Sequence, residues 1–229
     1  MNLLPASFET ERLRYERLDT DAVDVFDLYE VMGDADFELV ARHISKKRHH
    51  TPKDTWDYLR ESEEKWEEAE RANWAMFPKA GEPDGEGDDG LGGDDDDFAA
   101  GEFAGVASLI PLWDQRTARL GIWLRKPFWG RGYSGERADA LVELAFDRLD
   151  LELVAAAHTT ENEGSKRAIE KYVETWGGQY DGVLRNWITL DGEPRDLHRY
   201  TITREQYEES DVDTGLQVHE ELSVGEAEP

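Results

Sequence analysis

The chain has 229 residues, of which 38% are hydrophobic and none is cysteine. This length accommodates one domain with its own core, and the lack of cysteine excludes disulfides, thiolate metal sites and a cysteine nucleophile. With 53 acidic against 26 basic residues the formal net charge is −27, which repels nucleic-acid phosphates and anionic membrane surfaces. We therefore expect neither nucleic acid nor a membrane among its partners.

The acidic residues are spread along the chain, and arginine outnumbers lysine. This distribution is typical of a protein adapted to high salt, because a Debye length of about 3 Å at 1 M salt screens the self-repulsion. The sequence shows no secretory signal and no apolar run long enough to span a bilayer, so we expect a halophilic, cytoplasmic protein. The alternative interpretation is an acidic face that recruits a basic protein substrate.

The first half of the chain alternates between predicted strands and helices. Alternating apolar residues predict a strand over residues 8–18, and a capping sequence predicts a helix over 22–32. A threonine followed by proline marks a second helix over 51–72. Residues 74–77 and 103–110 predict a pair of strands.

The connection between these paired strands, residues 80–102, is rich in glycine and acidic residues. Like charges without apolar residues do not form a core, so we expect a disordered hairpin insertion. The aspartates lack the spaced ligands and closing glutamate of a calcium loop, and we therefore expect no metal there.

The second half follows a strand–helix–strand–helix order and ends in a hairpin. The predicted strands cover 116–124 and 151–158, the helices 133–149 and 163–176, and the hairpin strands 182–190 and 197–203. Together with the first half, this order predicts a single domain of the α/β (α+β) class over residues 8–207. Residues 208–229 predict an acidic flexible tail.

The stretch from Trp129 to Gly135 reads WGRGYSG and lies between a predicted strand and a predicted helix. Glycines at such a junction allow backbone N–H groups to converge on an anion, and the start of the helix adds unpaired donors and partial positive charge. The loop therefore predicts a diphosphate site. It lacks the Gly-Lys-Ser/Thr of a Walker loop and the third glycine of the dinucleotide fingerprint.

One helix and one strand later comes TENEGSKRAIEKY, residues 160–172. With this segment the sequence resembles the GNAT acetyltransferase superfamily, and within it the branch that acetylates ribosomal-protein N-termini. The segments that carry the resemblance are 11–13, 121–124, 129–133, Asn162 with Ser165, and 182–186. The resemblance implies a GNAT-like domain whose mixed, twisted central sheet is flanked by helices. Two of its parallel strands would splay apart to admit acetyl-CoA.

The resemblance also implies which residues hold acetyl-CoA. They are Trp123, Leu124, Trp129, Gly130, Arg131, Gly132, Ser134, Gly135, Asn162 and Ser165. In such enzymes the amine attacks the thioester directly, and a backbone N–H near Leu124 would polarise its carbonyl. Asn162 would bind the pantetheine arm, and Ser165 would lie near the sulfur as a proton donor. From the residues alone, Asn162 is equally a helix cap and Ser165 an ordinary first-turn serine.

The sequence does not identify the general base. Arg119 occupies a position where many relatives carry glutamate, and Ile188 a second position that supplies a base in the related branch. His158, near the end of its predicted strand, suits a general base because a neutral imidazole accepts a proton near pH 7. The alternative for His158 is a structural role. Tyr172 is a candidate acid, but its helix runs on past the usual exit, so a core position is the alternative.

His43, His49 and His50 lie between the two N-terminal helices, where relatives build the acceptor rim. We expect them to be substrate-facing at most, because their spacing does not suit a metal site. The expected function is acetyl-CoA-dependent transfer to an amine, with a protein N-terminal α-amine as the acceptor. The alternatives are acetylation of a small amine, such as a polyamine or an amino sugar, and a non-catalytic acyl-CoA-binding module. Both a monomer and a homodimer remain open.

Overall fold

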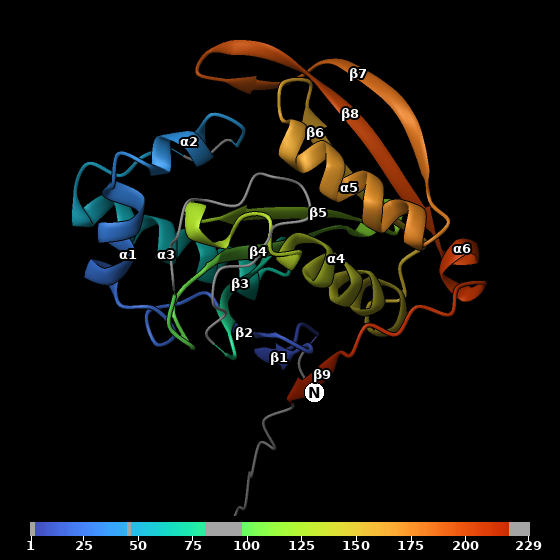
Figure 1. The fold of residues 1–229 in the computed structure, drawn as a ribbon, viewed down its shortest axis with the longest axis horizontal. Helices are drawn as coiled ribbons and strands as arrows, with labels where there is room; N and C mark the ends of the chain where they lie inside the picture. Colours follow the sequence, from blue (N-terminus) through green and yellow to red (C-terminus); the bar gives the residue numbers. More distant parts are fainter. Residues whose placement is uncertain (1–2, 45–46, 81–97, 220–229) are drawn as a thin grey trace, which may run out of the picture.

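A computed structural model describes residues 3–44, 47–80 and 98–219 of the protein. Within these residues, nine strands form one sheet in the order β7-β8-β6-β5-β4-β3-β2-β1-β9 (Figure 1). The strands are β1 (Ser7–Glu9), β2 (Leu13–Arg17), β3 (Ala72–Pro78), β4 (Gly105–Leu112), β5 (Thr117–Leu124), β6 (Leu153–Thr159), β7 (Gln179–Leu190), β8 (Glu193–Thr203) and β9 (Gln217–His219). The helices are α1 (Val25–Gly33), α2 (Phe37–Ala41), α3 (Pro52–Glu67), α4 (Tyr133–Glu143), α5 (Glu163–Thr175) and α6 (Arg204–Glu208).

The parallel pair at the centre of the sheet confirms the splayed strands that the sequence implied. β5 and β6 pair only at their first three positions, from Thr117 with Leu153 to Arg119 with Ala155. Beyond that point β5 continues to pair with β4, and β6 with β8. The last five residues of β5 therefore have no neighbouring strand on the β6 side, and a gap opens between the carboxyl ends of the two strands.

The N-terminal strand prediction was wrong in one respect. Residues 8–18 form two antiparallel strands rather than one, with Ser7 opposite Glu16. The turn between them is closed by Thr10, whose backbone N–H donates to the carbonyl oxygen of Leu13 at 2.9 Å. Apolar alternation continues through this short turn, so the sequence pattern contained no sign of the reversal.

Helix boundaries follow local capping chemistry. The side chain of Asp24 accepts from the N–H groups of Phe26 and Asp27 and begins α1 three residues later than predicted. Thr51 and Asp54 form a reciprocal capping box at the start of α3. The predicted helix over 133–149 is α4 followed by a π-helical turn, Leu144–Arg148.

Two apolar cores hold the helices to the sheet. One packs α4 and α5 against the sheet and includes Tyr133, Leu141 and Val173. The other packs α1, α2 and α3 near the ends of β3, β4 and β5, and includes Leu28, Phe37 and Trp123. The two helix groups thus flank the gap between β5 and β6 (Figure 1).

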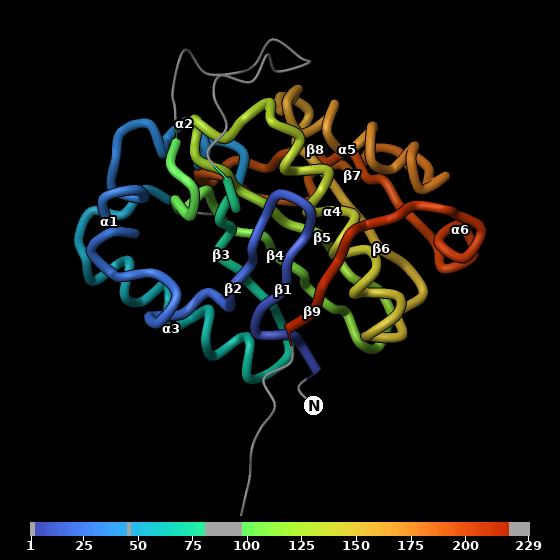
Figure 2. Tube along the Cα trace, turned by 60° about the horizontal axis from the view of Figure 1, so that its bottom comes forward, coloured from blue at the N-terminus to red at the C-terminus, as the bar shows by residue number. Residues whose placement is uncertain are grey.

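The segment after β8 crosses the molecule instead of leaving it. Residues 204–208 form α6, and β9 adds to the edge of the sheet beside β1, with Phe8 opposite Val218 (Figure 2). The predicted flexible tail over 208–229 thus contains a strand between residues 217 and 219, and its last ten residues lie outside the described part. Most of the predicted insertion over 80–102 also lies outside it.

Candidate functional site

A cleft of about 1150 Å³ opens where β5 and β6 part. Its larger part, called here the glycine-loop end, is lined by residues 128–136, one face of α5 along its whole length, the β1–β2 turn, and residues 213–215. Its smaller part, called here the α2 end, is lined by Leu39, Val40, Arg42, His43 and Ile44. The cleft therefore joins two sites of different construction in one continuous space.

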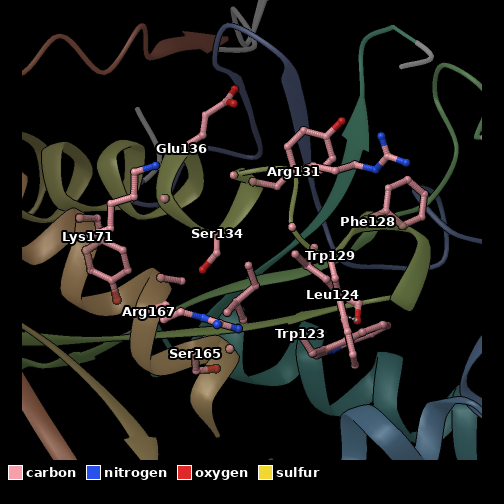
Figure 3. A pocket seen from close by; sticks show the side chains of 18 of the residues that line it. Trp123, Leu124, Phe128, Trp129, Arg131, Ser134, Glu136, Ser165, Arg167 and Lys171 are labelled. Atoms are coloured by element: carbon pink, nitrogen blue, oxygen red, sulfur yellow. Dashed lines mark hydrogen bonds between the residues drawn. The ribbon is translucent and has the colours of Figure 1, made fainter. Parts of the chain in front are cut away.

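The cleft is far more balanced in charge than the whole chain. Its basic residues are Arg12, Arg42, Arg131, Arg167 and Lys171, and its acidic residues are Glu11, Glu136, Asp139, Glu161, Glu163 and Asp213. Figure 3 shows the Arg167 side chain extending from α5 into the space between α4 and α5. Neither Arg167 nor Lys171 was singled out from the sequence. Their four-residue spacing, which places both on one helix face, was the available signal.

The glycine loop bends sharply into α4. Gly130 and Gly132 have φ of 73° and 77°, a region that other residues rarely enter. Gly132 is the N-cap of α4 and contributes no capping side chain, while the side chain of Ser134 points into the cleft (Figure 3). The first turn of α4 thus presents N–H groups and a hydroxyl to the same space, an arrangement that suits an anion.

A clamp that the sequence did not predict holds this loop. Oε1 of Glu136 accepts from the Thr10 hydroxyl at 2.5 Å and the Arg12 N–H at 2.8 Å. Oε2 accepts from Nε of Arg12 at 2.8 Å. Nη1 of the same arginine donates to the carbonyl oxygen of Arg131 at 2.9 Å. The β1–β2 turn is therefore tied to both the loop and the helix, although more than one hundred residues separate them.

Two loop residues use their side chains within the protein. Arg131 donates through Nε to the carbonyl oxygen of Pro127 at 2.9 Å, and its guanidinium lies over the ring of Phe98. Its charge is thus directed away from the cleft centre (Figure 3). Trp129 donates through its indole N–H to the carbonyl oxygen of Leu124 at 2.8 Å and closes the loop onto β5.

The end of β5 directs a backbone donor into the gap. Gly105 lies against Trp123, so close that a Cβ on Gly105 would collide with the Trp123 carbonyl oxygen. That carbonyl therefore points toward β4. Because the described peptide bonds are trans, the N–H of Leu124 points the opposite way, toward the missing pairing side of β5. Gly105 was not identified from the sequence, since its role depends on a neighbouring strand.

At the start of α5 the structure confirms the helix-cap interpretation of Asn162. Its Oδ1 accepts the N–H of Ser165 at 3.0 Å, which makes it the helix N-cap. The cap orients the side chain beside the cleft and uses only the oxygen, so the amide N–H donors stay available. Ser165 also lines the cleft, near the carboxyl end of β6 (Figure 3).

Tyr172 lies on the cleft wall but is buried against α4. Burial raises the pKa of Tyr172 to about 12, although the positive charge of the buried Arg137 acts in the opposite direction. Seven residues separate it from Ser165, which corresponds to about 10 Å along the helix. The Tyr172 side chain is almost fully buried, so its surroundings are those of a core residue.

His158 is not among the residues that line the cleft in the described part of the chain. Its Nδ1 is 2.8 Å from the carbonyl oxygen of Thr159, its Nε2 is 3.4 Å from the Tyr200 hydroxyl, and its ring stacks on His198. Burial lowers the pKa of His158. These contacts support the structural alternative and not the predicted role as a base.

The three N-terminal histidines occupy different environments. His43 lines the α2 end of the cleft, and its Nδ1 lies 3.5 Å from Oγ1 of Thr159. His49 instead pairs through Nδ1 with Oγ1 of Thr55 at 2.9 Å, and His50 is exposed. Only His43 of the three lines the cleft.

Metal and membrane chemistry have no structural support in the described residues. They contain no cluster of three or more histidine and acidic side chains placed to hold a metal ion. None of their helices combines the length and apolar character that a bilayer crossing requires.

Known proteins share the sequence features and the architecture of this chain. The family described as Acetyltransferase (GNAT) domain matches residues 12–172. YdaF of Bacillus subtilis (strain 168), whose name provisionally assigns it as a ribosomal N-acetyltransferase, is 31% identical over 110 residues, covering 47% of this chain and 57% of the relative. The FsC-acetyl coenzyme A-N(2)-transacetylase of Aspergillus fumigatus is 33% identical over 126 residues, covering 48% of this chain and 49% of the relative. The matches thus span about half of each curated relative.

A solved structure extends the similarity over nearly the whole chain. Mycobacterium smegmatis RimJ in complex with CoA-disulfide has a TM-score of 0.70 at 15% identity, with 94% of each chain covered. At this identity the likeness concerns the fold. Because the family match covers more than half of the residues, the chain belongs to the GNAT acetyltransferase domain family.

Proposed function

We propose that this protein is an acetyl-CoA-dependent N-acetyltransferase that transfers the acetyl group directly to a primary amine. The observation that carries the proposal is the cleft between the parted ends of β5 and β6, which joins the glycine loop to the α2 end. Direct transfer requires donor and acceptor to be held together, and one cleft with two ends meets that requirement.

The residues of the glycine-loop end fit the donor. A diphosphate suits the N–H groups of the α4 start, where Gly135 leaves open space on its Cβ side. The pantetheine amides would pair with the unpaired edge of β5, and the amide of Asn162 would bind the same arm. Arg167, a cation on the cleft wall, would complement the phosphate charge.

The chemical step needs charge stabilisation where the thioester carbonyl develops negative charge. The N–H of Leu124 is proposed to donate to that oxygen, since it faces the gap and has no neighbouring strand on that side. Ser165 is proposed to supply the proton to the departing sulfur. Tyr172 is not assigned this role, because it lies about 10 Å further along α5.

The acceptor is proposed to be the α-amine of a protein N-terminus. Support comes from the name of YdaF, and the α2 end offers apolar side chains for a residue beside the amine. A small-molecule amine is the second candidate, because the Aspergillus transacetylase is similar at comparable identity. Both candidates share the same donor site and the same reaction.

Calorimetric titration at molar KCl tests the donor site. Acetyl-CoA and desulfo-CoA are expected to bind with similar affinity, and ATP to bind weakly because it lacks the pantetheine arm. Failure of both CoA forms to bind would remove the basis of the proposal.

Release of CoA thiol then separates the acceptor classes. The substrates are short peptides with a free α-amine, the same peptides with a blocked α-amine, a polyamine and an amino sugar. Turnover that requires the free α-amine supports the N-terminal assignment, and turnover confined to the small amines supports the second candidate. CoA binding without turnover of any amine would identify a non-catalytic binding module.

A further inference from the structure

His43 lies near the ends of the two splayed strands, β5 and β6. The paired positions of β5 and β6 differ by 36 residues, as in Thr117 with Leu153. Counting on by the same number past the point where the strands part, Thr159 at the end of β6 corresponds to Trp123 near the end of β5. His43 contacts Thr159 through Nδ1 and lines the cleft. The imidazole therefore lies at the level where β5 ends and the N–H of Leu124 enters the gap.

The surroundings of His43 suit a neutral imidazole next to a cation. The side chain is half-buried, and burial lowers its pKa, with Arg42 acting in the same direction and Glu161 opposing it. Glu161 lines the same cleft from the β6–α5 loop. Its carboxylate is placed to attract an incoming ammonium group, and across the cleft the charged residues at the start of α5 are Glu163 and Arg167.

The ring nitrogens of His43 have separate environments. Nδ1 faces Oγ1 of Thr159, and Nε2 has no protein partner among the described residues. In the tautomer that carries its proton on Nδ1, the threonine hydroxyl accepts from Nδ1–H and Nε2 is the proton acceptor. The other candidate histidine, His158, has contacts on both ring nitrogens and does not line the cleft within the described residues.

We propose that His43 is the general base that removes a proton from the acceptor ammonium at the α2 end of the cleft. This assignment rests on the proposed acetyl transfer. Nε2 takes one proton from the ammonium, the amine nitrogen then bonds to the acetyl carbon, and the bond between that carbon and the CoA sulfur breaks. Ser165 donates its hydroxyl proton to the departing thiolate, and the second proton, which leaves the nitrogen as the amide forms, restores the serine hydroxyl. The imidazolium returns its proton to solvent.

The test compares pH–rate profiles of kcat/KM for the wild type and two variants. His43→Asn keeps a side-chain group near Thr159 but has no group at the position of Nε2, and His43→Gln provides a second replacement in case one folds poorly. At pH 7 both variants should lose about 100-fold in kcat/KM, in the range for loss of a general base. The loss should shrink as the pH rises, because the ammonium then loses its proton to solvent without a general base. The Kd of acetyl-CoA should stay within about twofold.

His49→Asn is the matched control, since it removes a histidine with a similar threonine contact outside the cleft lining. It should keep the wild-type profile. Activity of both His43 variants within about threefold of the wild type, with an unchanged profile, would overturn the assignment while leaving the proposed function intact. A wild-type protein that binds acetyl-CoA but acetylates no amine would overturn both.

Discussion

The two ends of the cleft are built in different ways. The glycine-loop end depends on backbone conformation, with positive φ at Gly130 and Gly132 and a carboxylate clamp from Glu136. The α2 end is formed by side chains of a five-residue helix that has no side-chain cap and by the three residues that follow it, 42–44. The ring of Phe37 packs edge-on against Trp123. Backbone N–H groups are present whatever the side chains are, so a site built from them keeps its ligand class when the sequence changes. A site built from side chains can bind a different acceptor after a few amino-acid substitutions.

The largest expected effect comes from placing charge at the glycine-loop end. Gly135→Glu adds a carboxylate where the diphosphate is proposed to bind, and like charges about 4 Å apart repel by about 4 kcal/mol at an intermediate dielectric. Acetyl-CoA affinity should fall more than about 100-fold by calorimetry. Gly135 has no positive φ, and no atom lies within 4 Å of the position that a Cβ would take, so thermal unfolding should be little changed. Unchanged CoA affinity would contradict the assigned site.

We choose Gly135 over Gly132 for this test because of the structure. Gly132 has φ of 77°, and a Cβ there would approach Nη2 of Arg12 to 3.3 Å. A substitution at Gly132 would therefore strain the backbone and disturb the clamp at the same time. Its effect on CoA binding could not be separated from its effect on folding.

Breaking the clamp should have the next largest effect. Glu136→Ala removes the acceptor of the Thr10 hydroxyl and of two Arg12 donors, and hydrogen bonds to a charged group contribute about 1.5 to 3 kcal/mol. The free energy of unfolding should fall by about 2 kcal/mol, and acetyl-CoA should bind more weakly. Asp57→Ala is the control, because its exposed pair with Lys53 should contribute less than about 1 kcal/mol. Equal effects of the two variants would refute the clamp.

A buried acid gives the glycine-loop end its own pH dependence. Burial raises the pKa of Asp139 to about 6 from an ordinary 3.8, even though Trp176 donates to its carboxylate. The folded state binds the proton more tightly than the unfolded state does. The resulting contribution to the free energy of unfolding is therefore present at low pH and is lost as the pH rises from about 4 to about 6. Asp139→Asn should be about 1 to 2 kcal/mol more stable than the wild type at about pH 7.5. The difference should vanish below about pH 4 in urea titrations, and a constant difference would contradict this origin.

Enlarging a side chain at the α2 end should weaken binding of the acceptor amine and leave acetyl-CoA binding unchanged. Leu39→Trp narrows this end, and a steric cost of about 1.4 kcal/mol corresponds to a roughly tenfold rise in KM for the amine. The Kd of acetyl-CoA should not change. Phe26→Trp, at an exposed position on α1 outside the cleft lining, should leave both constants unaltered. A parallel loss of CoA affinity in Leu39→Trp would mean that the two ends are not separable.

The smallest expected effect is that of salt concentration on thermal stability, because it is divided among many charged residues. The net charge of −27 is distributed over the chain, whereas the cleft is nearly balanced. Raising KCl from about 10 mM to about 1 M shortens the Debye length from about 30 Å to about 3 Å, so the melting temperature should rise. Maximal stability at low salt would argue against adaptation to a salty environment.

Local patterns predicted most elements and the glycine loop because their causes are local. Glycines before a helix, a Thr-x-x-Asp cap at residues 51–54 and apolar periodicity act over a few residues. Two errors share one cause. The reversal at Thr10 and the strand at 217–219 depend on pairing with other strands, because β1 needs β2 and β9 needs β1.

By itself, the sequence determined the class of the fold, the glycine loop before α4 and the order of the cleft-lining segments. Only the tertiary structure decided which polar residues reach the cleft. It directed Arg131 onto Pro127, buried His158 beside Tyr200 and brought His43 against Thr159. The physical reason is that side-chain direction depends on packing between elements far apart in the chain, whereas backbone turns and caps depend on neighbours.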